Sequence, residues 1–285
     1  MKKIVSLALA LALPLAMAAC GGNNATPSNS PAPPSPGMEP SSGSVSAPGE
    51  ESSATILIAA AASLELVLRD RLIPAFREQH PGIAVEGSYD SSGKLQRQIE
   101  EGLPADLFLS AARAQMDALV DQGLVDRDSV LPLLENELVL IVPTGQENAI
   151  SSFEELPRAG QVAIGDPDSV PAGQYAREVL ISLGLWEALT AAEARLSLGS
   201  NVTEVLNWVA EGSADAGIVY ATDAATTDRV TVVARAPEGS LATRVIYPAG
   251  VVSSSRHKEA AALFLDFLQS EEAIAAFGEY GFLPA

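Results

Sequence analysis

Groups that can donate hydrogen bonds recur where apolar, strand-like segments give way to helix-like ones. These junctions carry Ser63, Ser91-Ser92-Gly93, Val170-Pro171-Ala172-Gly173, Asn201-Val202-Thr203 and Tyr220. In parallel α/β sheets such junctions lie along the carboxyl edge of the strands, where ligands bind. A helix start there exposes unpaired N–H groups and the positive end of the helix dipole. The chemistry that this pattern favours is the binding of an anion without Lys or Arg.

Each junction taken alone has a simpler explanation. Ser63, Ser92 and Asn201 are ordinary N-cap residues. Gly93 could be present simply because it permits a tight turn. An aromatic residue at a strand end, such as Tyr220, is commonly a packing residue. The spacing by itself therefore predicts an anion-binding α/β protein and leaves the anion open.

The elements that must position these residues alternate along the chain. Expected strands cover residues 55–60, 83–89, 106–110, 138–143, 161–165, 216–220, 230–234 and 243–252. Expected helices cover residues 64–76, 92–101, 115–122, 173–183, 202–211, 256–269 and 271–277. The alternation of strands and helices predicts α/β lobes with mainly parallel sheets.

Sequence signatures of enzymes are missing. The chain has two histidines, His80 in a loop before Pro81 and His257 in a charged helix start, and both are expected to be solvated. No nucleophile elbow, HExxH, P-loop or GxGxxG motif occurs. Asp166 and Asp168 lie in a turn that contains proline, and we interpret them as turn formers. The sequence favours binding over catalysis.

The first 53 residues differ in composition from the rest. Lys2, Lys3 and an apolar run at residues 4–15 are typical of an export signal, expected to span 1–19, because the run is too short to cross a bilayer. The segment Met17-Ala18-Ala19-Cys20 resembles a bacterial lipobox, which implies lipidation of Cys20. Residues 20–53 are rich in Ser, Pro and Gly, which predicts a disordered, lipid-anchored linker.

Charge excludes one class of partner. Removal of residues 1–19 leaves 15 basic against 36 acidic side chains, so nucleic acid is not an expected ligand. Cys20 is the only cysteine, which excludes an intrachain disulfide.

From residue 54 onward the chain resembles the molybdate-binding proteins of ABC importers. The resemblance is carried by AAAASL at 59–64, SSG at 91–93, PADLFLSA at 104–111, GDP at 165–167, VPAG at 170–173 and GIVYATDA at 217–224. It implies the two-lobed, type II periplasmic-binding-protein-like fold, each lobe a mainly parallel sheet flanked by helices. Lobe one would comprise 54–137 plus 246–285, lobe two 138–245, with the ligand in the cleft between them.

The resemblance also implies a function and a location. The chain would be an extracytoplasmic, membrane-anchored solute-binding protein, monomeric and not an enzyme. It would capture molybdate or tungstate and deliver it to the permease subunit of an ABC importer. A receptor for sulfate or another tetrahedral oxyanion on the same fold is the alternative.

Five residues are implied as ligands of the oxyanion. They are Ser63, Ser92 and Tyr220 through their hydroxyl groups, and Ala172 and Val202 through their backbone N–H groups. This set contains donors only, which suits a fully deprotonated oxyanion and leaves a protonated phosphate without an acceptor. The metal would be held through its oxygens, with no direct bond to the protein, and no cofactor is expected.

Overall fold

The computed structural model describes residues 54–191 and 195–285. The expected signal segment, Cys20 and the linker lie outside the described residues. Among the helices of the described part, none is long and apolar enough to cross a membrane.

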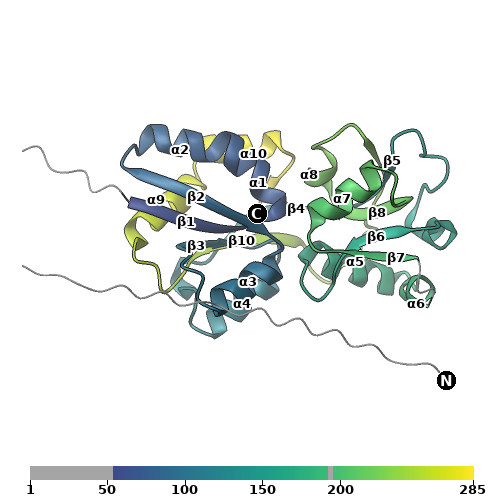
Figure 1. Ribbon diagram of the computed structural model, residues 1–285, viewed down its shortest axis with the longest axis horizontal. Coiled ribbons are helices and arrows are strands. Elements are labelled where there is room, and N and C mark those ends of the chain that lie inside the picture. The colour runs from purple at the N-terminus through teal and green to yellow at the C-terminus, as the bar shows by residue number, and fades with distance from the viewer. Residues whose placement is uncertain (1–53, 192–194) are drawn as a thin grey trace, which may run out of the picture. The chain divides into compact units, whose positions relative to one another are not determined.

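The described chain forms two sheets (Figure 1). The first has the strand order β11-β4-β10-β3-β1-β2, and the second has the order β7-β6-β8-β5-β9. Strands of the first sheet are β1 (Ala54–Ala61), β2 (Ile83–Asp90), β3 (Leu107–Leu109), β4 (Leu131–Asn136), β10 (Val245–Val251) and β11 (Leu283–Pro284). Strands of the second are β5 (Leu138–Pro143), β6 (Val162–Gly165), β7 (Leu196–Gly199), β8 (Ala216–Tyr220) and β9 (Val230–Arg235).

Both sheets are mixed, so the expectation of mainly parallel sheets was wrong in this detail. Strand β1 pairs in parallel with β2 and β3, and β6 pairs in parallel with β7 and β8. Strand β10 is antiparallel to β3 and β4, and β5 is antiparallel to β8 and β9. The reason is that the chain enters β5 directly from the first sheet and enters β10 directly from the second sheet. They therefore run away from the side at which β1, β2, β6 and β8 end.

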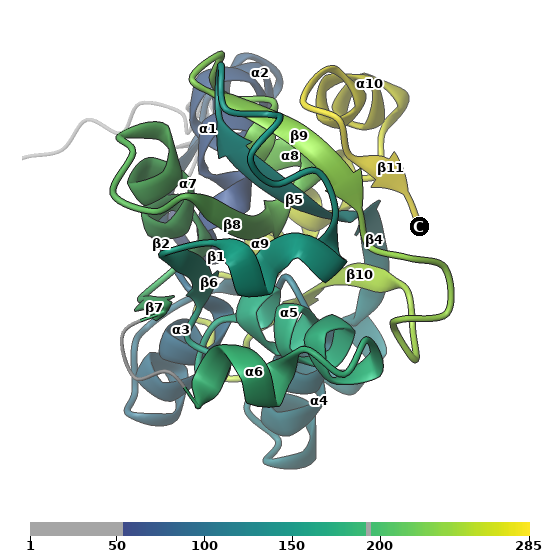
Figure 2. The same ribbon diagram turned by 90° about the vertical axis from the view of Figure 1, so that its right-hand side faces the viewer.

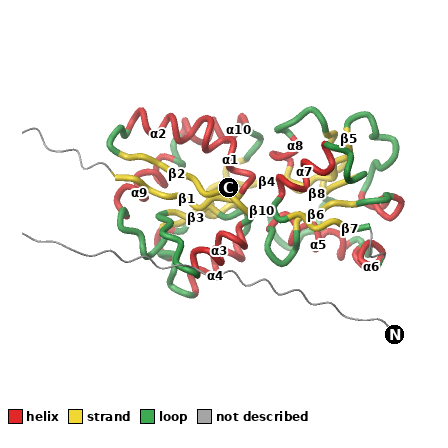
Figure 3. Tube along the Cα trace, in the orientation of Figure 1, coloured by secondary structure: helices red, strands yellow, loops and turns green. Residues whose placement is uncertain are grey.

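Helices cover both faces of each sheet (Figure 3). Those of the first part of the chain are α1 (Glu65–Val67), α2 (Ile73–Gln79), α3 (Ser92–Glu100) and α4 (Arg113–Asp121). The rest are α5 (Pro171–Ser182), α6 (Trp186–Thr190), α7 (Val202–Ala210), α8 (Ala221–Ala224), α9 (Lys258–Phe267) and α10 (Glu271–Glu279). Figure 2 shows α7 on one side of the second sheet and α5 and α6 on the other.

The first expected helix is interrupted. Residues Ala62–Leu64 form a 3-10 turn, and Leu68–Leu72 form a π-helical turn between α1 and α2. Pro74 lies in the first turn of α2. Because proline lacks an N–H and its ring clashes with the carbonyl four residues earlier, a regular helix cannot run through this point. The predicted apolar face is buried nonetheless, with Leu64, Leu68 and Phe76 inaccessible to solvent.

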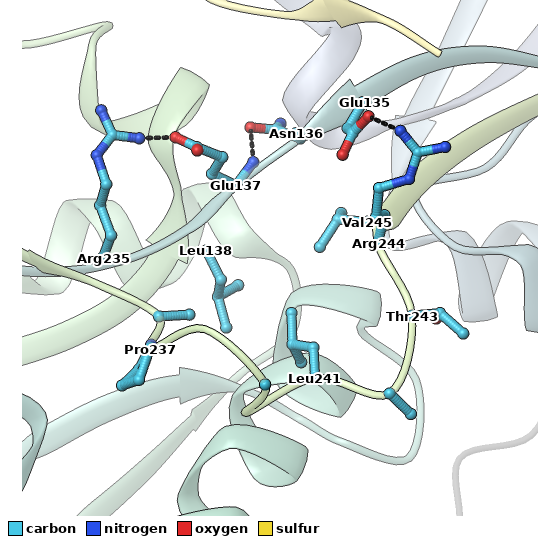
Figure 4. Close-up of a pocket in the computed structure, with 13 residues that line it drawn as sticks. Glu135, Asn136, Glu137, Leu138, Arg235, Pro237, Leu241, Thr243, Arg244 and Val245 are labelled. Atoms are coloured by element: carbon cyan, nitrogen blue, oxygen red, sulfur yellow. Dashed lines mark hydrogen bonds and ion pairs between the residues drawn. The ribbon is translucent and has the colours of Figure 1, made fainter.

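The chain passes between the sheets twice. Glu137 joins β4 to β5, and residues 236–244 join β9 to β10. These two crossings lie beside a pocket of about 320 Å³ (Figure 4). Glu135 forms an ion pair with Arg244, N to O 2.7 Å, and Glu137 forms one with Arg235. Both arginines are largely exposed, so the pairs contribute little stability, but they tie one crossing to the other.

Candidate functional site

The five residues implied as ligands line one cavity between the two sheets. Ser63, Ser92, Ala172, Val202 and Tyr220 all contribute to its wall. The cavity measures about 10 Å³ in this conformation, roughly the space of one water molecule, so a larger ligand can enter only if the lobes separate. The much larger pocket beside the crossings is lined by paired charges and apolar side chains and includes none of the five. We therefore place the candidate site in the narrow cavity.

Two serines approach the cavity from the first sheet. Ser63 lies in the 3-10 turn that follows β1, and its Oγ is 2.9 Å from Oη of Tyr247. Ser92 begins α3, and its Oγ accepts a hydrogen bond of 2.9 Å from the N–H of Ala111. Because that bond occupies a lone pair on Ser92, the hydroxyl proton remains free to be donated to a ligand.

Two helix starts approach the cavity from the second sheet. Ala172 is in the first turn of α5, directly after Pro171, and Val202 is the first residue of α7. First-turn N–H groups have no partner within their own helix and carry the positive end of its dipole. Asn201 caps α7 by accepting a 2.9 Å bond from the N–H of Glu204, which leaves the N–H of Val202 uncapped by this side chain.

Tyr220 closes the cavity at the end of β8. Its side chain is 1% exposed, and its hydroxyl donates a long hydrogen bond of 3.4 Å to the carbonyl of Ala111. Burial raises the pKa of Tyr220 well above its ordinary value. The phenol therefore keeps its proton at neutral pH and stays a hydrogen-bond donor there.

The electrostatics of the cavity depend on neutral groups. In the part of the chain that the structure describes, no Lys or Arg side chain lines this cavity. Asp90 does line it, but its carboxylate accepts a 2.7 Å bond from the N–H of Ser91 and a 3.2 Å bond from Lys94 Nζ. Its charge is thus compensated, and hydroxyl and N–H donors remain as the groups available to an anion.

Contacts between the two lobes hold the cavity closed. The N–H of Gly93 in α3 donates to the carbonyl of Ser169 at 3.0 Å. Gln115 Nε2 in α4 donates to Gln174 Oε1 in α5 at 3.1 Å. Since these bonds join elements of different sheets, separation of the lobes must break them.

Three polar residues near the cavity were not among the predicted ligands. Ser91 also lines the cavity, is buried, and its Oγ has no hydrogen-bond partner within residues 54–191 and 195–285. Its position directly before Ser92, in the serine pair at the start of α3, was a usable signal in the sequence. Tyr247 and Asn136 reach the site through side-chain hydrogen bonds, and nothing in their local sequence marks them.

Asp223 is a buried carboxylate next to the site. It lies in α8, three residues after Tyr220, and is 5% exposed. Its Oδ2 has no hydrogen-bond partner among the described residues. Burial raises its pKa from 3.8 to about 7, although backbone hydrogen bonds at Tyr220 and at Asp223 itself act in the opposite direction.

This shift predicts a fall in stability as pH rises. The folded state holds a proton that the unfolded state releases, so the contribution is fully present below about pH 4 and is lost as pH approaches about 7. We expect the melting temperature of the wild type to fall more steeply between pH 5 and pH 8 than that of Asp223→Asn. Calorimetric scans across this range measure both slopes, and equal slopes would show that Asp223 stays ionised throughout.

Metal ions in proteins are commonly bound by clusters of His, Cys, Asp or Glu side chains. Within residues 54–191 and 195–285, no group of three or more His, Cys, Asp or Glu side chains is arranged to hold one. The carboxylate of Asp166 accepts hydrogen bonds from the N–H of Asp168 and from the hydroxyl of Ser169, as expected in a turn. A ligand that contains a metal would meet hydroxyl and N–H donors in the cavity.

Comparison with known proteins gives a consistent result. A family model described as bacterial extracellular solute-binding protein matches residues 56–283. A Bacillus subtilis protein named as an ABC transporter substrate-binding lipoprotein is 38% identical over 232 residues, 81% of this chain and 87% of the relative. The molybdate-binding protein of Escherichia coli is 37% identical over 233 residues, 80% of this chain and 88% of the relative. The periplasmic molybdate-binding protein of Azotobacter vinelandii aligns with a TM-score of 0.71 and 26% identity, covering 81% and 99% of the two chains.

Proposed function

This chain belongs to the bacterial extracellular solute-binding proteins, and from that premise we propose that it captures molybdate or tungstate for an ABC importer. The observation that carries the proposal is the gathering of Ser63, Ser92, Ala172, Val202 and Tyr220 around one small cavity. Relatives at 37% and 35% identity are molybdate-binding proteins, which supports the choice of anion. Proteins of this class deliver their ligand to a permease subunit, the expected partner here.

The ligand set explains the choice among anions. Hydroxyl and backbone N–H groups can donate hydrogen bonds to the oxygens of a fully deprotonated oxyanion. A hydrogen phosphate must also donate a hydrogen bond, and the five proposed ligands are all placed as donors, so none of them is assigned to accept it. We infer that molybdate and tungstate bind and that phosphate is rejected.

A thermal-shift series tests this function. Molybdate and tungstate at a hundred times their dissociation constants should stabilise the fold by roughly 2.7 kcal/mol through mass action, visible as a raised melting temperature. Phosphate at the same concentration should leave the melting temperature unchanged. A sulfate shift larger than the molybdate shift would instead identify a sulfate receptor, and a phosphate shift as large as that of molybdate would contradict the donor-only set.

The remaining proposals concern what the protein does not carry and where it sits. We propose that it has no catalytic activity and no cofactor, because hydrogen-bond donors dominate its cavity and both histidines lie elsewhere. We also propose that it is monomeric and extracytoplasmic. Its membrane attachment would come from lipid on Cys20, in keeping with the relative named as a lipoprotein.

Lipidation of Cys20 predicts a clear change in location. Replacement Cys20→Ser should release the protein from membranes, because no acyl chain would then be attached and membrane binding scales with buried apolar groups. Its affinity for molybdate should be unchanged, since the cavity is built from residues 61–220. Fractionation of cells that express each form measures the partition. A variant that stays with the membrane as fully as the wild type would rule out Cys20 as the anchor.

A further inference from the structure

Ser63 is the last member of a chain of side-chain hydrogen bonds that begins at the crossing between the lobes. Its Oγ is 2.9 Å from Oη of Tyr247. The same Oη lies 3.2 Å from Nδ2 of Asn136, and that Nδ2 also lies 2.8 Å from Oγ1 of Thr222. Asn136, Thr222 and Tyr247 are 4%, 3% and 1% exposed, so water hardly reaches these groups.

The direction of the protons in this chain follows from its first member. Oδ1 of Asn136 accepts a 2.9 Å bond from the N–H of Glu137, as Figure 4 shows. A backbone N–H can only donate, so the amide is oriented with its nitrogen toward Tyr247, where it too can only donate. Oη of Tyr247 therefore accepts from Asn136, and Oγ of Ser63, 2.9 Å away, is an acceptor within reach of its own proton.

The same reasoning continues to the ligand. When Tyr247 donates to Oγ of Ser63, that hydroxyl has accepted a bond and its proton points away from Tyr247. Burial raises the pKa of Tyr247 well above its ordinary value, so the phenol keeps the proton that it donates. The hydrogen bonds in such a chain polarise one another, which makes the final hydroxyl a stronger donor. Ser63 lines the cavity, where its hydroxyl would donate a hydrogen bond to a bound oxyanion.

The fold holds Tyr247 in place for this contact. A register shift separates Tyr247 from Pro248 in the pairing of β10 with β4. Such irregularities re-aim side chains next to functional sites. The ring packs edge-on against Tyr220 and Phe282, with centroids 5.6 and 5.5 Å away. Removal of the hydroxyl alone should therefore leave the ring where it is.

We propose that Tyr247, oriented by Asn136, is a positioning residue that fixes the Ser63 hydroxyl as a donor and so helps to reject anions that carry a proton. This inference rests on the proposed function, because it assumes that an oxyanion occupies the cavity. It assigns the selectivity of the site partly to residues that do not touch the ligand.

The test is a double-mutant cycle measured by titration calorimetry with sodium molybdate. Tyr247→Phe should weaken binding about three- to tenfold, the usual range for one hydrogen bond. In a Ser63→Ala background the same change should alter affinity less than about twofold, because the residue through which it acts is gone. The ratio of molybdate to phosphate affinity should also fall in Tyr247→Phe, since the Ser63 hydroxyl could then accept a hydrogen bond from a protonated phosphate. Tyr280→Phe, which removes the hydroxyl of a half-buried tyrosine outside the cavity, is the matched control and should change neither value.

A second variant keeps the test independent of the first. In Asn136→Asp the introduced carboxylate can still accept from the N–H of Glu137, but its other oxygen accepts from Tyr247 and turns the chain around. Molybdate affinity should fall more than in Tyr247→Phe, and part of that loss should vanish when Ser63 is Ala. The melting temperature of each unliganded variant shows that it folds.

The outcomes separate this inference from the proposed function. Wild-type protein that binds molybdate, together with an unchanged Tyr247→Phe variant or equal losses in both Ser63 backgrounds, would overturn the positioning role alone. Wild-type protein that binds neither molybdate, tungstate nor sulfate would overturn both proposals.

Discussion

Replacement of Ala172 by Asp is expected to abolish measurable molybdate binding, with a loss of affinity of at least a thousandfold. Ala172 lines the cavity, is 1% exposed and stands in the first turn of α5. A carboxylate there would lie within a few ångströms of a bound dianion. At 4 Å and an effective dielectric constant of about 20, one pair of like charges costs roughly 4 kcal/mol, about a thousandfold in affinity. Titration calorimetry at fixed ionic strength measures the change.

Two variants at the same position separate charge from size. Ala172→Asn carries nearly the same volume without the charge and should lose much less affinity than Ala172→Asp. Ala172→Gly keeps the backbone N–H and should remain within about tenfold of the wild type, since glycine costs a helix only about 0.5–1 kcal/mol. An acidic side chain favours a helix N-terminus, so the unliganded fold should survive. Tight binding by Ala172→Asp would place residue 172 outside the ligand shell.

The candidate site could be predicted because its parts are local. Ser63, Ser92 and Tyr220 each stand where a strand ends, and Ala172 and Val202 each open a helix after a strand. Such junctions are visible as a change from an apolar run to a helix start. The common edge of one sheet gathers the two serines, and that of the other gathers Ala172, Val202 and Tyr220. That the two edges face each other across one cleft was implied by the resemblance to two-lobed binding proteins.

The chain of hydrogen bonds behind Ser63 could not be predicted in this way. Ser63 and Tyr247 are 184 residues apart, and Asn136 and Tyr247 are 111 apart. Contacts over such separations depend on the order of strands in the sheet, which brings β4 beside β10 and leaves no pattern in the sequence. The direction of β5 and β10 was missed for a related reason. An apolar run predicts a strand but does not show from which end it enters its sheet.

The reason for a glycine at position 93 differs between the sequence interpretation and the structure. From the sequence it could simply permit a turn, yet its φ is not in the left-handed region, and it lies inside α3. What requires glycine is a close approach of the two lobes. A Cβ at this position would lie 2.4 Å from the carbonyl oxygen of Ser169 and 2.9 Å from its Cα. Because these are backbone atoms of the turn before α5, they cannot swing aside.

Gly93→Ala should therefore weaken molybdate binding at least a hundredfold. The added methyl group keeps the lobes apart and moves the N–H groups of Ala172 and Val202 away from the two serines. Loss of two hydrogen bonds to a charged ligand, at about 1.5–3 kcal/mol each, corresponds to more than a hundredfold in affinity. The open form has no such clash and gains about 0.5–1 kcal/mol, because alanine is the better residue inside a helix. The unliganded melting temperature should thus stay level or rise while the affinity falls.

Opposite changes in stability and affinity are the mark of an effect on closure alone. Gly278→Ala in α10 is the matched control, because a Cβ there meets no atom within 4 Å. It should raise the melting temperature in the same way and leave molybdate binding unchanged. Calorimetric titration and thermal scans of both variants give the comparison. If Gly93→Ala bound molybdate as tightly as Gly278→Ala, the ligand would be held without the contact between Gly93 and Ser169, and the closed arrangement of the lobes would not be the one that binds.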